Sequence, residues 1–183
     1  VAPMLDYIIT DFEKSRGALN DSGIGGMVIC DSADQARKMF ELFQRRSPAK
    51  VIELHPQKAT SDAFNPGMAA TNHAPYGEQR KDTCKVRPAA LILHDVGTKD
   101  ERKGWIEDFK DGKIDFLFVY NMLLTGFDAR RLKKLYLGRV IRKHNLLQAL
   151  TRVNRPYNGF RYGYVVDFAD IRKEFDATNK AYF

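Results

Sequence analysis

The sequence has few residues that could form disulfide bonds or bind a metal. Its 183 residues include two cysteines, Cys30 and Cys84, with no paired spacing. The four histidines, at positions 55, 73, 94 and 144, show no metal-ligand spacing with one another or with the cysteines. We therefore expect no metal site within this chain. So little cysteine also fits a reducing, cytoplasmic compartment.

The sequence also lacks a membrane segment, because no apolar run reaches the roughly 18 residues that such a helix needs. It has no signal-peptide pattern. It begins "VAPMLDYIITDFEK", without an initiator methionine, which reads as a piece of a longer protein cut at a domain boundary. With 44% hydrophobic residues, the chain can bury a real core. We expect one domain over residues 1–183.

Three catalytic patterns are missing. There is no G-x-x-x-x-G-K-[ST] loop to cradle phosphates and no Asp-Glu-x-His strand end to hold Mg²⁺. There is also no cluster of carboxylates with a lysine of the kind that cuts nucleic acid. We expect the isolated chain neither to hydrolyse ATP nor to cleave DNA.

Acidic residues are absent between Asp128 and Asp167, although the whole chain carries a net charge of only +7. A solvated surface normally mixes both signs, so a block of one sign favours a polyanionic partner such as nucleic acid. The cations of this basic block are Arg130, Arg131, Lys133, Lys134, Arg139, Arg142, Lys143, Arg152, Arg155 and Arg161.

Apolar runs alternate with segments of helical periodicity along most of the chain. This alternation predicts an α/β fold with a mostly parallel sheet flanked by helices. Asp31 or Ser32 is expected to cap the second helix, and Thr98 with Glu101 forms a capping box before the third. We expect helices at 3–16, 31–46, 98–109 and around 145–155, and strands at 26–30, 49–54, 89–95, 114–120, 133–138 and 161–168.

Two regions fall outside this alternation. Residues 55–88 show no periodicity and contain scattered proline and glycine, so they form an irregular insertion or loop. Residues 168–183 would begin a C-terminal extension.

The segment "LLTGFDARRL" follows the apolar run "IDFLFVY" and therefore lies at the carboxyl end of a strand, where open α/β sheets bind ligands. Gly126 allows a close backbone approach to a phosphate, and Thr125 can donate a hydroxyl hydrogen bond. Asp128 can orient a cation or a ribose. The alternative is an ordinary turn between strands.

The segment "QALTRVNRPY" places Gln148, Arg152 and Arg155 at i, i+4 and i+7, which predicts one face of a helix that Pro156 ends. Leucines and Val153 fall mostly on the other side. The alternative is a polar helix face that is merely solvated.

In this order the two segments resemble motifs V and VI of the second RecA-like motor domain of superfamily 2 helicases and translocases. The second matches the pattern Gln-x-x-Gly-Arg-x-x-Arg, except that Thr151 replaces the glycine. "GMVICDSADQARKMF" looks like motif IV. The run "FVYNMLLTGFDARRLKKLYLGRVIRKHNLLQALTRVNRPY", followed by "YGYVVDFADI", closely resembles the restriction (R) subunit of type I restriction–modification enzymes.

This resemblance implies a composite ATP site between two motor lobes, with Arg155, Arg152 and Gln148 as its catalytic residues. Gly126 and Asp128 would join the two arginines in binding the nucleotide. The missing first RecA-like domain of the same protein would bind most of the ATP and Mg²⁺.

The resemblance also implies partners. The domain would contact the backbone of double-stranded DNA without reading its sequence, and specificity and methyltransferase subunits would complete the complex. The implied DNA contacts are Ser32, Thr125, Gly126, Arg130 and Arg131. Capping the helix is an equally good role for Ser32.

Two other functions remain open from the sequence. The first is a different superfamily 2 DNA or RNA helicase, which a strand-unwinding assay would separate from a translocase on duplex DNA. The second is a non-enzymatic nucleic-acid-binding module that has no motor partner. A phosphate-loop motif upstream in the parent gene would argue against that module.

Overall fold

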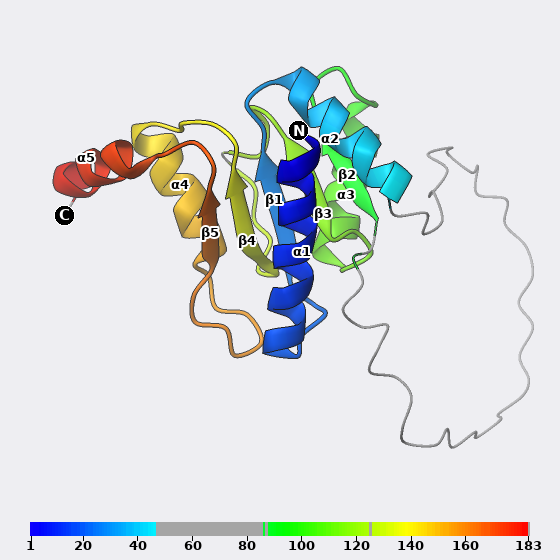
Figure 1. The fold of residues 1–183 in the computed structure, drawn as a ribbon, viewed down its shortest axis with the longest axis horizontal. Helices are drawn as coiled ribbons and strands as arrows, with labels where there is room; N and C mark the ends of the chain where they lie inside the picture. The colour runs from blue at the N-terminus through cyan, green and yellow to red at the C-terminus, as the bar shows by residue number, and fades with distance from the viewer. Residues whose placement is uncertain (47–85, 87, 125, 183) are drawn as a thin grey trace, which may run out of the picture.

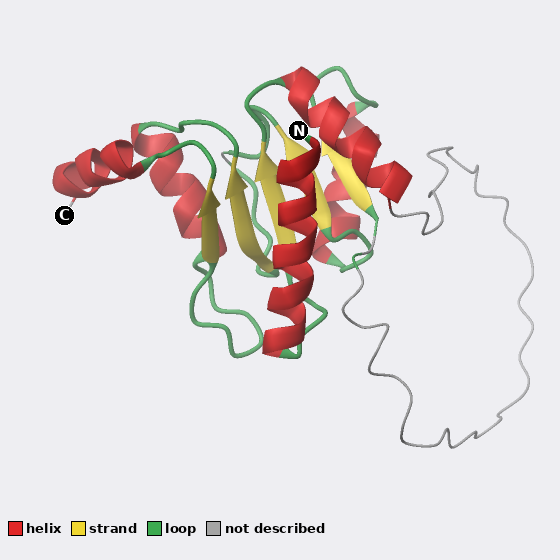
Figure 2. Ribbon diagram, viewed as in Figure 1, coloured by secondary structure: helices red, strands yellow, loops and turns green. Residues whose placement is uncertain are grey.

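A computed structural model describes residues 1–46, 86, 88–124 and 126–182. Figure 1 and Figure 2 show a sheet with helices on both faces. The helices are α1 (Ala2–Leu19), α2 (Ala33–Arg46), α3 (Lys99–Lys110), α4 (Lys143–Val153) and α5 (Arg172–Tyr182). The strands are β1 (Gly25–Ile29), β2 (Ala89–Ile92), β3 (Phe116–Val119), β4 (Leu132–Leu137) and β5 (Tyr164–Asp167).

All five strands are parallel and follow the spatial order β2-β3-β1-β4-β5, which confirms the expected fold class. Their carboxyl ends therefore meet at one edge of the sheet. In Figure 1, α1 and α2 cover the face toward the viewer, and α3 and α4 cover the other face. The strand candidate at 49–54 and most of the 55–88 segment lie outside the described residues.

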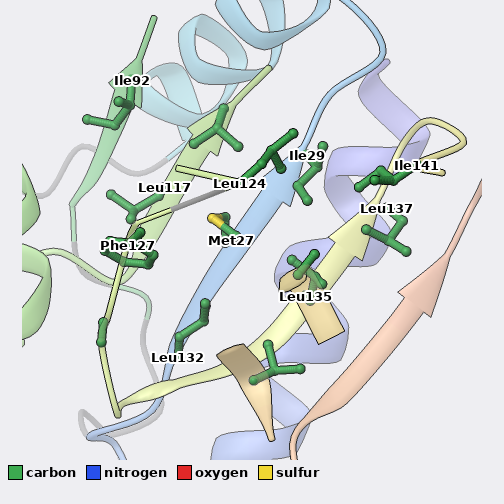
Figure 3. Packing of buried hydrophobic residues seen from close by; sticks show 14 of the residues in the cluster. Met27, Ile29, Ile92, Leu117, Leu124, Phe127, Leu132, Leu135, Leu137 and Ile141 are labelled. Carbon is green, nitrogen blue, oxygen red and sulfur yellow. The ribbon is translucent and has the colours of Figure 1, made fainter. Parts of the chain in front are cut away.

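Each face of the sheet has its own hydrophobic cluster. On the α1 and α2 side, Phe12, Phe43, Phe116 and Phe118 pack around one another, with 4.5 Å between the ring centroids of Phe12 and Phe116. On the α3 and α4 side, aliphatic residues of the strands form a second cluster with residues of the two helices. Figure 3 shows the part of this cluster that lies on the strands and on the segment after β3. A sheet covered on both faces explains why its strands read as nearly continuous apolar runs.

The expected helix starts are present. The Thr98 hydroxyl oxygen accepts from the Glu101 amide at 3.2 Å, and the Thr98 amide donates to the Glu101 carboxylate at 2.6 Å, which completes the capping box. At α2, the Ser32 hydroxyl oxygen accepts from the Gln35 amide at 3.1 Å. Cys30 is fully buried, and burial raises the pKa of its thiol to about 12, so it acts as a small apolar residue.

A buried carboxylate lies at the amino ends of the strands, between the two helical layers. Asp115 is fully buried, and its Oδ1 lies 2.6 Å from Nη2 of Arg16 and 3.0 Å from Nη2 of Arg131. Arg131 also donates to the carbonyls of Gly23 and Phe109, both at 2.7 Å. This buried ionic cluster (Arg16, Asp115 and Arg131) ties α1, the start of β3, the end of α3 and the segment before β4 to one point.

Within the described part of the chain, no helix is both long and apolar enough to cross a membrane. The longest, α1, alternates buried residues such as Leu5, Ile8 and Phe12 with exposed polar ones, as an amphipathic surface helix does.

The buried ionic cluster generates a stability prediction. Asp115→Ala leaves two arginines in the core without their shared counterion, so the free energy of unfolding should fall by about 3–5 kcal/mol. Urea unfolding, followed by the fluorescence of the single tryptophan, Trp105, measures this loss. As a control, Glu41→Ala removes a carboxylate that is 60% exposed from its pair with Arg45 and should cost far less. Equal losses in the two variants would contradict this role for Asp115.

Candidate functional site

The candidate site lies where the segment after β3 meets the end of α4. From Val119 the chain runs back across the α3 and α4 face of the sheet to reach Leu132. Leu124, Phe127 and Ala129 are buried in the hydrophobic cluster on that face, and Figure 3 labels the first two. These apolar anchors leave Gly126 and Asp128 exposed between them.

Gly126 has the backbone geometry that its residue type suggests. Its φ is +70°, in the left-handed region that favours glycine. A Cβ built on it would meet no heavy atom within 4 Å, so the space above its backbone is open. An approaching group could therefore reach this backbone closely. Thr125, the other half of the predicted turn, lies outside the described residues.

Arg152 lies on α4, and its Nε donates to the carbonyl oxygen of Leu124 at 3.3 Å. The side chain is partly buried, and burial is the main cause that lowers the pKa of its guanidinium. The neighbouring positive charge of Arg155 lowers this pKa further, and Asp128 opposes both effects. An arginine remains charged in such a setting. Arg152 thus joins α4 to the segment that follows β3.

Arg155 forms an ion pair with Asp128. Both side chains are about half exposed, at 47% and 59%. Asp128 is therefore paired with a cation that comes from the second predicted segment. The two sequence motifs, almost thirty positions apart, therefore meet through two arginines, one carboxylate and one carbonyl.

The expected helix face needs a correction. Gln148 and Arg152 are on α4, but the helix ends at Val153 and Asn154 is its C-cap. Arg155 therefore lies beyond the helix. The physical reason is Pro156, whose ring disfavours helical backbone in the preceding residue. The proline ends the helix earlier than expected and places Arg155 on the irregular segment that follows it.

Gln148 lies one turn before Arg152. Its side-chain nitrogen is 2.5 Å from Nε2 of His144, to which it donates when that ring nitrogen carries no proton. Its side-chain oxygen is buried and has no hydrogen-bond partner among the described residues. The proposed coupling role of Gln148 stays a prediction.

The basic block divides into buried and exposed members, which corrects part of the sequence analysis. Arg131 was expected to contact DNA, but only 3% of it is exposed and its donors bind Asp115 and backbone carbonyls. Lys133 and Lys134 are also buried. Lys134 is 2.7 Å from the carboxylate of Asp11 on α1. These three cations stabilise the fold and are not accessible to a polyanion.

The remaining cations of the block keep to the surface or the carboxyl edge. Arg130 is exposed beside the buried Arg131. Arg139 follows β4 and donates to the side-chain oxygen of Asn121 at 2.8 Å. Ser32 is partly buried, and its bond to the Gln35 amide is the capping role considered above. DNA contacts by Arg130 and Ser32 stay predictions.

Sequence reasoning missed the inward role of Lys133. Its Nζ donates to the carbonyl of Val153 at 3.3 Å and also to the carbonyl of Arg155. The available signal was its place in the apolar strand "LKKLYL". A lysine within a strand that is covered on both faces must find acceptors inside the protein.

Comparison with known proteins adds a family to this geometry. Residues 22–170 match the family model described as type I restriction enzyme subunit R domain 3. The endonuclease subunit of the type I restriction enzyme HindI from Haemophilus influenzae is 36% identical over 144 residues, which are 73% of this chain and 12% of that protein. A type I endonuclease subunit from Staphylococcus aureus (strain COL) is 41% identical over 80 residues, or 43% of this chain and 8% of that subunit.

Two solved structures share the fold at low sequence identity. Domain 2 of the DEAD-box helicase Mss116p, bound to an RNA duplex, aligns with a TM-score of 0.57 and 14% identity. The alignment covers 97% of this chain and 56% of that one. The helicase domain of Hef from Pyrococcus furiosus gives 0.52 and 10%, with coverages of 99% and 29%.

The family match extends over most of the chain and includes every residue of the candidate site. The structural matches identify the architecture as that of a RecA-like helicase domain. The chain spans only about a tenth of the length of the curated relatives. Because the family model matches residues 22–170, the chain belongs to the family of domain 3 of the type I restriction enzyme R subunit.

Proposed function

We propose that this chain is the second motor lobe of an ATP-dependent translocase on double-stranded DNA, within the R subunit of a type I restriction enzyme. The observation that carries the proposal is the meeting of Arg152, Arg155 and Asp128 at the exposed end of α4. Two arginines beside an open glycine backbone suit the phosphates of a nucleotide held by a facing lobe.

The exposed ion pair between Arg155 and Asp128 suits a catalytic arginine that must exchange its partner for a phosphate when nucleotide binds. A pair this exposed contributes only about 0–1 kcal/mol, so exchanging the carboxylate for a phosphate oxygen is easy. Asp128 meanwhile keeps the guanidinium near the cleft. In the closed motor, Arg155 would donate to the phosphoryl oxygens on which charge develops during transfer to water.

The described residues also fit a division of labour between two lobes. They contain no group of three or more histidine, cysteine, aspartate or glutamate side chains placed to hold a metal ion. We assign Mg²⁺ and most of the ATP contacts to the first RecA-like domain. This chain supplies Arg152 and Arg155, and alone it would not hydrolyse ATP or cut DNA.

The DNA contacts would come from the exposed residues of the segment between β3 and β4. Gly126 offers open backbone and Arg130 an exposed cation, both suited to phosphates and indifferent to base sequence. Recognition of a target site and its methylation would belong to the specificity and methyltransferase subunits.

The first test is Arg155→Ala in the full-length protein that contains this chain. DNA-stimulated ATP turnover should fall by at least about 10²-fold while ATP affinity changes little, because the group acts mainly in the transition state. Steady-state turnover and equilibrium nucleotide binding measure the two quantities. Arg45→Ala is the matched control, since Arg45 is also an exposed arginine paired with a carboxylate but lies on α2. Near-normal turnover in Arg155→Ala would mean that the end of α4 is only a solvated surface.

A second test concerns DNA. Arg130→Ala in the same protein should weaken binding to a duplex that lacks the recognition site. It should also reduce the slope of log affinity against log salt by about one, the effect of losing one phosphate contact. Fluorescence anisotropy over a salt series measures both, again with Arg45→Ala as the control. An unchanged slope would remove Arg130 from the DNA contacts.

A further inference from the structure

Arg155 needs a fixed backbone, because its side chain is too exposed to be held by packing. Nearly half of that side chain is exposed, and its partner Asp128 is more exposed still. A catalytic group acts best when the structure around it fixes its position in advance. The contacts that hold residues 153–157 are therefore the ones that decide where the guanidinium can reach.

Lys133 makes the central contact of this kind. Only 1% of it is exposed, and its Nζ donates to the carbonyl oxygens of Val153 and Arg155. The final carbonyls of a helix lack partners within the helix, and a cation there is favoured by the helix dipole. Asn154, with φ −89° and ψ 17°, does not adopt the left-handed conformation of the common glycine cap. The ammonium group thus caps α4 from the sheet side.

The register of β4 explains how Lys133 reaches this position. Gly25 and Gly26 of β1 pair with Leu132 and Lys134 of β4, so the strand bulges at Lys133. Leu132 and Leu135 belong to the cluster on the α3 and α4 side, and Lys134 pairs with Asp11 on the opposite side. A bulge commonly re-aims a side chain. Here the bulge turns the side chains of both Leu132 and Lys133 toward the face of the sheet that α4 covers.

Two further contacts hold the neighbouring backbone. A Cβ on Gly163 would lie 2.1 Å from the Val153 carbonyl oxygen, so the chain entering β5 lies directly against the end of α4. On the far side of Arg155, the Tyr157 hydroxyl is 3.4 Å from the Gly23 carbonyl oxygen. Lys133 is the charged member of this set and the one that binds the carbonyl of Arg155 itself.

We propose that Lys133 is a positioning residue for Arg155, which it serves by fixing the backbone from Val153 to Arg155 through its ammonium group. This inference rests on the proposed function, because it concerns the arginine that would reach the ATP phosphates. Because Lys133 is buried, it would touch neither nucleotide nor DNA. Burial lowers the pKa of its ammonium group. The two carbonyl acceptors replace part of the hydration that the ammonium group loses on burial.

The test is a double-mutant cycle in the full-length protein. Lys133→Met keeps the apolar stem but removes all three donors. Displacing a catalytic group by about 1 Å can cost about 10²-fold, so DNA-stimulated turnover should fall by about 10- to 10²-fold with ATP affinity nearly unchanged. Lys133→Arg, which restores a cationic donor, should recover part of the rate. In an Arg155→Ala background, Lys133→Met should change turnover by less than about twofold, because the positioned group is already gone.

Lys134→Met is the matched control. This neighbouring lysine is nearly as buried as Lys133 but pairs with Asp11 on the other face of the sheet. It should lower the melting temperature while leaving turnover, measured well below that temperature, close to wild type. A melting curve for each variant identifies any change that comes from unfolding.

Three results would overturn the inference. If Lys133→Met lowers turnover equally with and without Arg155, the loss comes from general structural damage. A strong effect of Arg155→Ala with none from Lys133→Met would leave the proposed function standing and remove Lys133 from it. No effect of Arg155→Ala alone would overturn the proposed function and the inference together.

Discussion

The fold depends on the buried carboxylate of Asp115, whose negative charge is compensated by two arginines. Asp115 is fully buried, and two arginines from different layers converge on it. Replacing such a cluster by apolar residues could be neutral, but removing one member leaves charge without compensation. Arg131 also donates to carbonyls near the start of β1 and the end of α3. The amino ends of the strands are therefore joined at one polar point.

The candidate site depends on this arrangement because its two halves come from separate segments. The segment from Leu124 to Ala129 is pinned by apolar residues on the α3 and α4 face, and the end of α4 lies against β4 and the entry to β5. Arg152 and the pair of Arg155 with Asp128 then join segments that are each already fixed. The side chains of Arg155 and Asp128 are about half exposed, whereas these contacts hold the backbone that carries them.

Sequence patterns predicted most of the architecture, because periodicity reports burial directly. The parallel sheet, the Thr98 and Glu101 capping box and the Ser32 cap all follow from spacing and residue type. The sequence could not reveal which cations of the basic block are buried, since Arg130 and Arg131 look alike until Asp115 is placed. The position of Arg155 was readable in part: a proline restrains the residue before it, and that rule outweighs helical spacing.

The bulge in β4 has a consequence for how this chain can vary in length. Upstream of it, Arg131 is held by the buried ionic cluster, and downstream of it, residues 134–137 are in register with β1. Deleting one residue between these two anchors would remove the extra residue of the bulge and leave Leu132 and Lys134 as neighbours opposite Gly25 and Gly26. The register of residues 134–137 with β1 would be kept, but the lysine that reaches the end of α4 would be lost. The extra residue in β4 therefore separates the pairing of this strand from its contact with α4, because a strand one residue shorter could pair as before but could not bind the carbonyls of Val153 and Arg155.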